Sequence, residues 1–157
     1  MFTNGEIADV LVKELTKHSD PRGWLIEIFR EDEIDPRYRP VMEYISMTEP
    51  EIARGPHEHA DQADYFAFIG PSTFKVYLWD NRRNSPTYRN RMALLAGEEA
   101  PRTVIIPPGV VHAYKNVGGK TGMVVNLPNR LFAGRGRKET VDETRHELDP
   151  NSIFIID

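Results

Sequence analysis

Two histidines stand in the segment Arg54-Gly55-Pro56-His57-Glu58-His59, at a spacing that suits proton transfer or metal binding. In an extended strand, side chains two residues apart face the same side, so we expect His57 and His59 to project together into a cleft. A third histidine, His112, follows the turn Pro107-Pro108-Gly109. Imidazole has the ordinary pKa that suits a general base at neutral pH, and it is a common metal ligand. These three histidines therefore predict one chemical site.

The elements that must position these histidines are short. Most of the apolar or alternating runs have the length and the Val, Ile, Phe, Tyr and Thr content of strands, and Gly, Pro and Asn separate them. The runs are Val10–Leu15, Trp24–Phe29, Val41–Met47, Tyr65–Ile69, Phe74–Trp79, Met92–Leu95, Thr103–Ile106, Val111–Tyr114 and Met123–Leu127. This pattern predicts an all-β sandwich or small barrel. We expect no long helix, but a helical turn at Arg30–Ile34 and a short helix near Glu139–Glu147.

Composition limits the classes of function. A chain of 157 residues fits one domain, which we expect to span residues 1–157. The net charge of −4 argues against a nucleic-acid partner. The absence of cysteine excludes disulfides, thiolate zinc sites and a cysteine nucleophile. No apolar run approaches the roughly 20 residues of a membrane span, and no secretion signal is recognisable. We therefore expect a soluble, cytoplasmic protein without a membrane partner.

Two histidine segments resemble known motifs. The segment from Pro107 to Asn116, PPGVVHAYKN, matches the second cupin motif, and the segment RGPHEH resembles the first. Asp64 stands where metal-binding cupins usually have Glu. The resemblance implies a cupin double-stranded β-helix, a jelly-roll barrel, which agrees with the all-β prediction.

Further segments resemble the dTDP-4-dehydrorhamnose 3,5-epimerases. They are Asp20–Arg30 (DPRGWLIEIFR), Arg54–His57 (RGPH), Asp80 with Arg82 and Ser85-Pro86-Thr87, and Asp149-Pro150. The resemblance implies an isomerase of deoxysugar biosynthesis that needs no metal or other cofactor. Its substrate would be a nucleoside-diphospho-4-keto-6-deoxysugar, which it would epimerise by removing a proton alpha to the ketone. It also implies a homodimer whose N-terminal segment reaches the neighbouring subunit.

The resemblance also implies roles for individual residues. His57 occupies the position of the base, and Arg22 and Arg54 match arginines that hold the diphosphate. A planar guanidinium suits that role better than an amine does. Glu27 and Phe29 fall where the family contacts the nucleotide. The remaining predicted substrate-binding residues are Gln62 and His112.

The chain departs from the family at the general acid. The family uses a tyrosine in a late strand, but the matching stretch Asn126–Phe132 contains none. The lysine that follows the family's glutamine is also missing after Gln62. These departures leave Tyr44, Tyr65 and Tyr114 as candidate acids.

Three alternatives remain open on the sequence. A related, metal-free branch of sugar 3,4-ketoisomerases shows a similar RGxHxH pattern, with His57 and His59 sharing the proton transfers and Tyr44 as acid. A metal-dependent cupin would use His57, His59, Asp64 and His112 as ligands. A non-catalytic sugar-binding module would tolerate the missing tyrosine and lysine.

Overall fold

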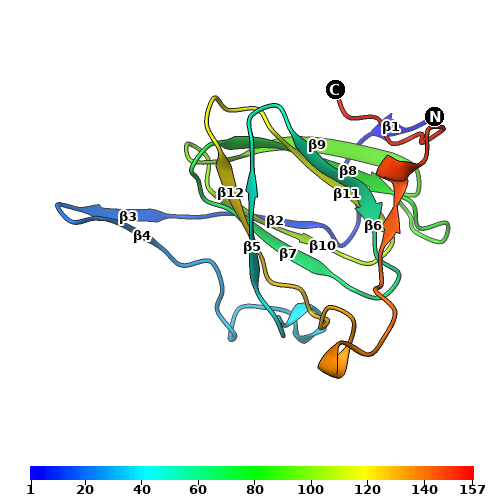
Figure 1. Ribbon diagram of the computed structural model, residues 1–157, viewed down its shortest axis with the longest axis horizontal. Helices are drawn as coiled ribbons and strands as arrows, with labels where there is room; N and C mark the ends of the chain where they lie inside the picture. Colours follow the sequence, from blue (N-terminus) through cyan, green and yellow to red (C-terminus); the bar gives the residue numbers. More distant parts are fainter.

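Two β-sheets face each other in the computed structural model, which describes residues 1–157, and a long hairpin projects from them (Figure 1). The strands are β1 Thr3–Asn4, β2 Leu11–Glu14, β3 Lys17–Asp20, β4 Gly23–Ile26, β5 Tyr44–Thr48, β6 Ala53–Glu58, β7 Asp64–Phe68, β8 Thr73–Asp80, β9 Asn90–Gly97, β10 Arg102–Ile106, β11 Val110–Asn116, β12 Gly122–Asn126 and β13 Thr144–Arg145. Three short 3₁₀ helices are η1 Pro36–Tyr38, η2 Arg135–Arg137 and η3 His146–Leu148. None of these helices has the length and apolar composition that crossing a membrane requires.

The order of strands is that of a jelly roll. One sheet runs β1-β9-β8-β11-β6-β13 and the other runs β2-β10-β7-β12-β5. Every pair is antiparallel except β1 with β9. The hairpin of β3 and β4 forms a separate two-stranded sheet that extends away from the barrel (Figure 1). The all-β, cupin-type jelly-roll prediction is confirmed.

Side-chain alternation places the core between the sheets. On β7, Phe66 and Phe68 point inward, while Tyr65 and Ala67 pack on the outer face with the segment before β5. On β11, the inward residues include Val110 and Tyr114. Burial of a large apolar side chain contributes on the order of 2 kcal/mol, so this interior layer holds the two sheets together. The same alternation directs Asp64 on β7 and His112 on β11 into the barrel.

The predicted helix over Glu139–Glu147 is wrong. Its residues contribute strand β13 and the first residues of η3. Thr144 pairs with Glu58 and Arg145 pairs with His57, which extends the sheet beyond β6. Tertiary pairing therefore overrides the helical preference of this polar segment. Strand β6 is not among the predicted apolar runs, because its sequence, ARGPHE, contains no run of apolar residues.

Candidate active site

A β-bulge on β6 directs the RGPH segment into the barrel. His57 pairs with His112 and Arg54 pairs with Tyr114, so β6 carries one more residue than β11 between these two pairs. Arg54 and His57 are three residues apart and would face opposite sides of a regular strand. The bulge lets both line the same cavity. Gly55 has a φ of +82° there, and a Cβ would lie 2.6 Å from the carbonyl oxygen of His112, so only glycine fits.

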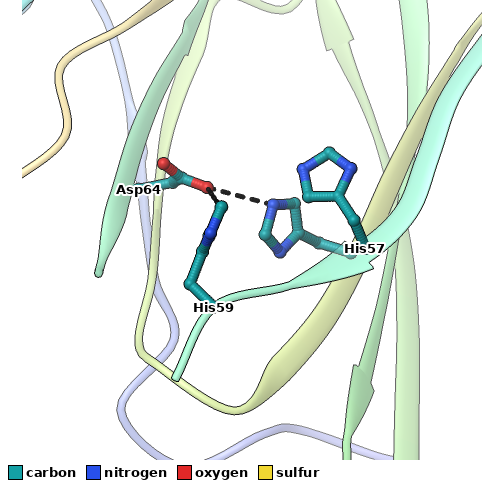
Figure 2. A group of neighbouring side chains, drawn as sticks. His57, His59 and Asp64 are labelled. Atoms are coloured by element: carbon teal, nitrogen blue, oxygen red, sulfur yellow. Dashed lines mark hydrogen bonds and ion pairs between the residues drawn. The ribbon is translucent and has the colours of Figure 1, made fainter. Parts of the chain in front are cut away.

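Four polar side chains converge inside the barrel beside this bulge. Figure 2 shows His57, His59 and Asp64 pointing toward one another. The ring centres of His57 and His112 lie 4.4 Å apart, and those of His57 and His59 lie 5.6 Å apart. Their ligand atoms and an oxygen of Asp64 all lie within 4.8 Å of one another. The structure thus brings together the three histidines that the sequence singled out.

Asp64, which is 1% exposed, contacts most of the other polar side chains of this cluster. Its Oδ2 accepts a hydrogen bond from His59 Nε2 at 3.0 Å and lies 3.0 Å from His112 Nε2, which is not aligned for a hydrogen bond. Its Oδ1 accepts hydrogen bonds from the side-chain amides of Gln62 and Asn126, both at 2.9 Å. Burial opposes ionisation, yet the imidazoles of His112 and His59 hold the pKa of Asp64 well below its usual range.

His59 is held in its doubly protonated form. Its Nδ1 faces the carbonyl oxygen of Asp142 and its Nε2 faces the Asp64 carboxylate. Both partners can only accept, so both ring nitrogens must carry hydrogen. Burial alone would lower the pKa of His59, but the hydrogen bond to Asp64 outweighs it and raises that pKa to about 9. The site therefore contains a fixed imidazolium at neutral pH.

His57 has the opposite protonation state. Burial, followed by the neighbouring His112 and His59, lowers the pKa of His57 to about 2. Its imidazole is therefore neutral at pH 7. A neutral imidazole can accept a proton, so His57 and the charged His59 differ in chemical role although they sit two residues apart.

Two adjoining cavities meet at this cluster. The smaller, of about 390 Å³, is lined by residues that include Arg54, His57 and Tyr114. The larger, of about 690 Å³, is lined by Gln62, Phe132 and several arginines. Tyr44, His59, Glu143 and Arg145 line both cavities. We call the smaller one the catalytic cavity.

The structure separates the three candidate tyrosines. Tyr44 is 45% exposed and lines both cavities, and its hydroxyl accepts a hydrogen bond from Asn126 Nδ2 at 2.8 Å. Burial raises the pKa of Tyr44, which keeps its proton on the oxygen. Tyr114 is 4% exposed and its hydroxyl shares a hydrogen bond with Ser46 at 2.8 Å. Tyr65 faces away and donates to the Ile28 carbonyl. Tyr44 is thus the tyrosine best placed to reach a ligand.

Four predicted substrate-binding residues lie outside the cavity walls of this chain. Arg22 is at the tip of the projecting hairpin, paired with Asp20, and Glu27 is paired with Arg30 on the surface. Phe29 packs edge-on against Tyr65 on the outer face of the five-stranded sheet. His112 is 2% exposed and lies behind His57. None of these four side chains lines the catalytic cavity or the larger cavity of its own chain.

Sequence reasoning missed four residues that shape the site. Asn126 joins Tyr44 to Asp64, and Asp142 holds His59. Glu143 and Arg145 form part of both cavity walls and pair with each other at 2.5 Å. A polar residue at an inward position of the apolar run MVVNL could have signalled Asn126. No local pattern marks the other three, because the C-terminal segment that carries them reaches the site through long-range contacts with β6 and with the turn that follows it.

The donor set of the cluster could also hold a divalent transition metal. Three imidazoles and a carboxylate are a common ligand combination for such ions. The Nδ1 atoms of His59 and His112 face the carbonyl oxygens of Asp142 and Val110, which leaves the Nε2 atoms directed at Asp64. A metal would have to displace the hydrogen bond between His59 and Asp64.

Comparison with known proteins assigns the chain to a family. Residues 4–138 match the family described as dTDP-4-dehydrorhamnose 3,5-epimerase. The chain is 33% identical over 127 residues to the "Probable low-salt glycan biosynthesis epimerase Agl13" of Haloferax volcanii, covering 80% of this chain and 81% of that protein. It is also 33% identical over 152 residues to the spore coat polysaccharide biosynthesis protein SpsL of Bacillus subtilis, covering 94% and 93%.

Solved structures share the fold. The dTDP sugar isomerase of Desulfovibrio desulfuricans superposes with a TM-score of 0.81 at 21% identity, covering 96% of this chain and 91% of that one. The dTDP-6-deoxy-D-glucose-3,5-epimerase of Legionella pneumophila, in complex with dTDP-4-keto-L-rhamnose, gives a TM-score of 0.75 at 21% identity, covering 94% and 78%. The chain therefore belongs to the dTDP-4-dehydrorhamnose 3,5-epimerase family and is an epimerase of carbohydrate biosynthesis.

Proposed function

We propose that this protein epimerises a nucleoside-diphospho-4-keto-6-deoxysugar, with His57 as the base and Tyr44 as the acid. A ketone acidifies the neighbouring C–H bond, so inversion needs a base on one face of the sugar and a proton donor on the other. The observation that carries the proposal is the placement of these two groups. His57 comes from β6 in one sheet and Tyr44 from β5 in the facing sheet, and both line the catalytic cavity.

The charged His59 suits the enolate that forms between these two steps. A fixed positive charge in a water-poor site stabilises a developing oxyanion without having to reorganise. Both ring nitrogens of His59 are engaged as donors, so it has no free lone pair with which to accept a proton. This arrangement supports an epimerase with a single histidine base over the ketoisomerase alternative, in which both histidines transfer protons.

Arginines in both cavities support an anionic substrate. Arg54 is anchored to Thr48 Oγ1 at 3.0 Å and to the Met47 carbonyl at 2.7 Å, which leaves other guanidinium N–H groups for a ligand. Arg130 and Arg135 line the larger cavity beside Phe132. The sugar would occupy the catalytic cavity, and the nucleotide would extend past Arg54 and into the larger cavity.

The projecting hairpin supports a homodimeric enzyme. An isolated two-stranded hairpin is marginally stable in water, and Trp24 and Leu25 on β4 are 50% and 66% exposed. In a dimer, the hairpin would cover its apolar side chains against the partner and bring Arg22 near the neighbouring cavity. Mixing the inactive variants Arg22→Ala and His57→Ala would then restore part of the activity in mixed dimers. No recovery on mixing, or a monomer by light scattering, would contradict this arrangement.

The decisive experiment is incubation with dTDP-4-keto-6-deoxyglucose in deuterated water, followed by NMR of the sugar. We expect deuterium at a carbon next to the ketone, inverted configuration there, and a ketone that stays at its original carbon. His57→Ala should reduce exchange by about 10²- to 10⁴-fold, because a general base is lost. Lys120→Ala, which removes an exposed side chain paired with Glu98 outside both cavities, is the control and should exchange normally. A ketone that moves to the adjacent carbon would identify a ketoisomerase instead, and an active His57→Ala variant would place the base elsewhere.

A further inference from the structure

The C-terminal segment over residues 141–148, which we call the strap, closes one side of the catalytic cavity. It runs along β6, where it forms β13 and η3 (Figure 1). Within the strap, His146 Nε2 lies 2.8 Å from Glu58 Oε1 on β6. Glu143, Arg145 and Glu147 of the strap all line the catalytic cavity. The position of the strap therefore decides part of the shape and charge of the site.

Asp142 anchors the strap at its N-terminal end with its side chain. One carboxylate oxygen accepts the backbone N–H of Ala60 at 2.7 Å, and the other accepts those of Asp61 and Gln62 at 2.8 and 2.9 Å. These three residues form the turn between β6 and β7, about 80 positions earlier in the chain. Hydrogen bonds from backbone N–H groups to a carboxylate are among the stronger ones in proteins.

The main chain of the same residue orients His59. The carbonyl oxygen of Asp142 accepts the Nδ1 hydrogen of His59, and this contact leaves Nε2 directed at Asp64. The carboxylate of Asp142 holds that carbonyl in place because it binds the turn that directly follows His59. One residue thus links the strap, the turn and the charged imidazole.

We propose that Asp142 is a positioning residue of the epimerisation, which anchors the strap through its carboxylate and orients His59 through its carbonyl. This proposal rests on the proposed function for its link to catalysis. Without the anchor, His59 loses the acceptor for its Nδ1 hydrogen, and the wall that carries Glu143 and Arg145 opens to water. The pairing of β13 with β6 and the contact between His146 and Glu58 do not involve Asp142, so the strap and barrel have other attachments.

The test compares Asp142→Ala and Asp142→Asn with the control Asp149→Asn, which changes an exposed acid of the same C-terminal segment outside both cavities. Asn keeps the shape of Asp, but its NH₂ group faces either the backbone N–H of Ala60 or those of Asp61 and Gln62, and it cannot accept their hydrogen bonds. For both Asp142 variants we expect kcat to fall by about 10- to 100-fold through misplacement of His59, with KM changed less than about threefold. The Nδ1 signal of the His59 ring should shift, because the carbonyl oxygen that faces this nitrogen is displaced. The amides of residues 60–62 should exchange faster with solvent, and the control should match the wild type.

Two results would overturn the proposal. A kcat within twofold of wild type would show that Asp142 positions nothing the reaction needs. A lower kcat with unchanged His59 ring signals would show that Asp142 acts by another route. If wild-type protein turns over no 4-ketosugar, the proposed function fails, but the ring signals and amide exchange still decide whether Asp142 holds His59. Melting curves identify a variant that fails to fold, and Asp142→Asn then serves in place of Asp142→Ala.

Discussion

Replacing Tyr44 with phenylalanine should separate proton removal from inversion. The substitution deletes one hydroxyl, which lines the catalytic cavity and accepts a hydrogen bond from Asn126 at 2.8 Å. Asn126 keeps its other hydrogen bond, to Asp64 at 2.9 Å, so the substitution removes only one of the two side-chain contacts of its amide nitrogen. We therefore expect a stability loss of about 1 kcal/mol or less.

The effect on the reaction should be far larger than the effect on stability. A general acid accelerates a reaction by about 10²- to 10⁴-fold, which corresponds to about 3 to 5 kcal/mol of activation free energy. Without the Tyr44 hydroxyl, the enolate can still recover a proton from the His57 side. In deuterated water, Tyr44→Phe should thus incorporate deuterium with retained configuration while epimer formation falls by that factor.

Tyr114→Phe is the matched control for this prediction. Its hydroxyl shares a hydrogen bond with Ser46 at 2.8 Å, and the residue is 4% exposed within the core. The loss should lower stability by about 1 kcal/mol and leave inversion unchanged. NMR of the sugar resolves deuterium content and configuration for both variants. Normal inversion by Tyr44→Phe, or an equal loss in Tyr114→Phe, would refute the assignment of Tyr44 as the acid.

Three further predictions follow from the same site. Arg54→Ala should weaken binding of a free nucleoside diphosphate by about 1.5 to 3 kcal/mol in calorimetry, with partial recovery in Arg54→Lys; equal affinity would remove Arg54 from the phosphate site. Thermal stability should be greatest near pH 6.5. Above it, stability is lost as the pH approaches 9, the raised pKa of His59; below it, the unfolded chain gains a proton that the folded chain, with the His57 pKa lowered to about 2, does not bind. A melting temperature constant between pH 6.5 and 9 would contradict this protonation pattern. Exchange activity should survive dialysis against a chelator, because His57 and Tyr44 need no metal for proton transfer; activity that is lost and then restored by a divalent ion would favour the metal-dependent alternative.

Local sequence determined the class of fold and the position of the chemistry. Short runs rich in Val, Ile, Phe, Tyr and Thr specify strands, and β7 and β11 are buried at nearly every residue because both of their faces are covered. The segments RGPHEH and PPGVVHAYKN identified His57, His59 and His112, because each motif is a contiguous stretch that can be recognised in the sequence alone. Strand β6 contains no apolar run. The motif on it therefore identified the site residues, but the strand itself and the bulge at Gly55 could not be predicted from the sequence.

Tertiary structure decided which chemistry each residue can perform. His57 and His59 have the same side chain and lie two residues apart in one motif, yet one is neutral and the other charged, because only His59 contacts both Asp64 and Asp142. Tyr44 faces the cavity while Tyr65 faces outward, although both lie on strands of the same sheet. Protonation and exposure depend on groups brought together from distant parts of the chain, and no local periodicity encodes those contacts.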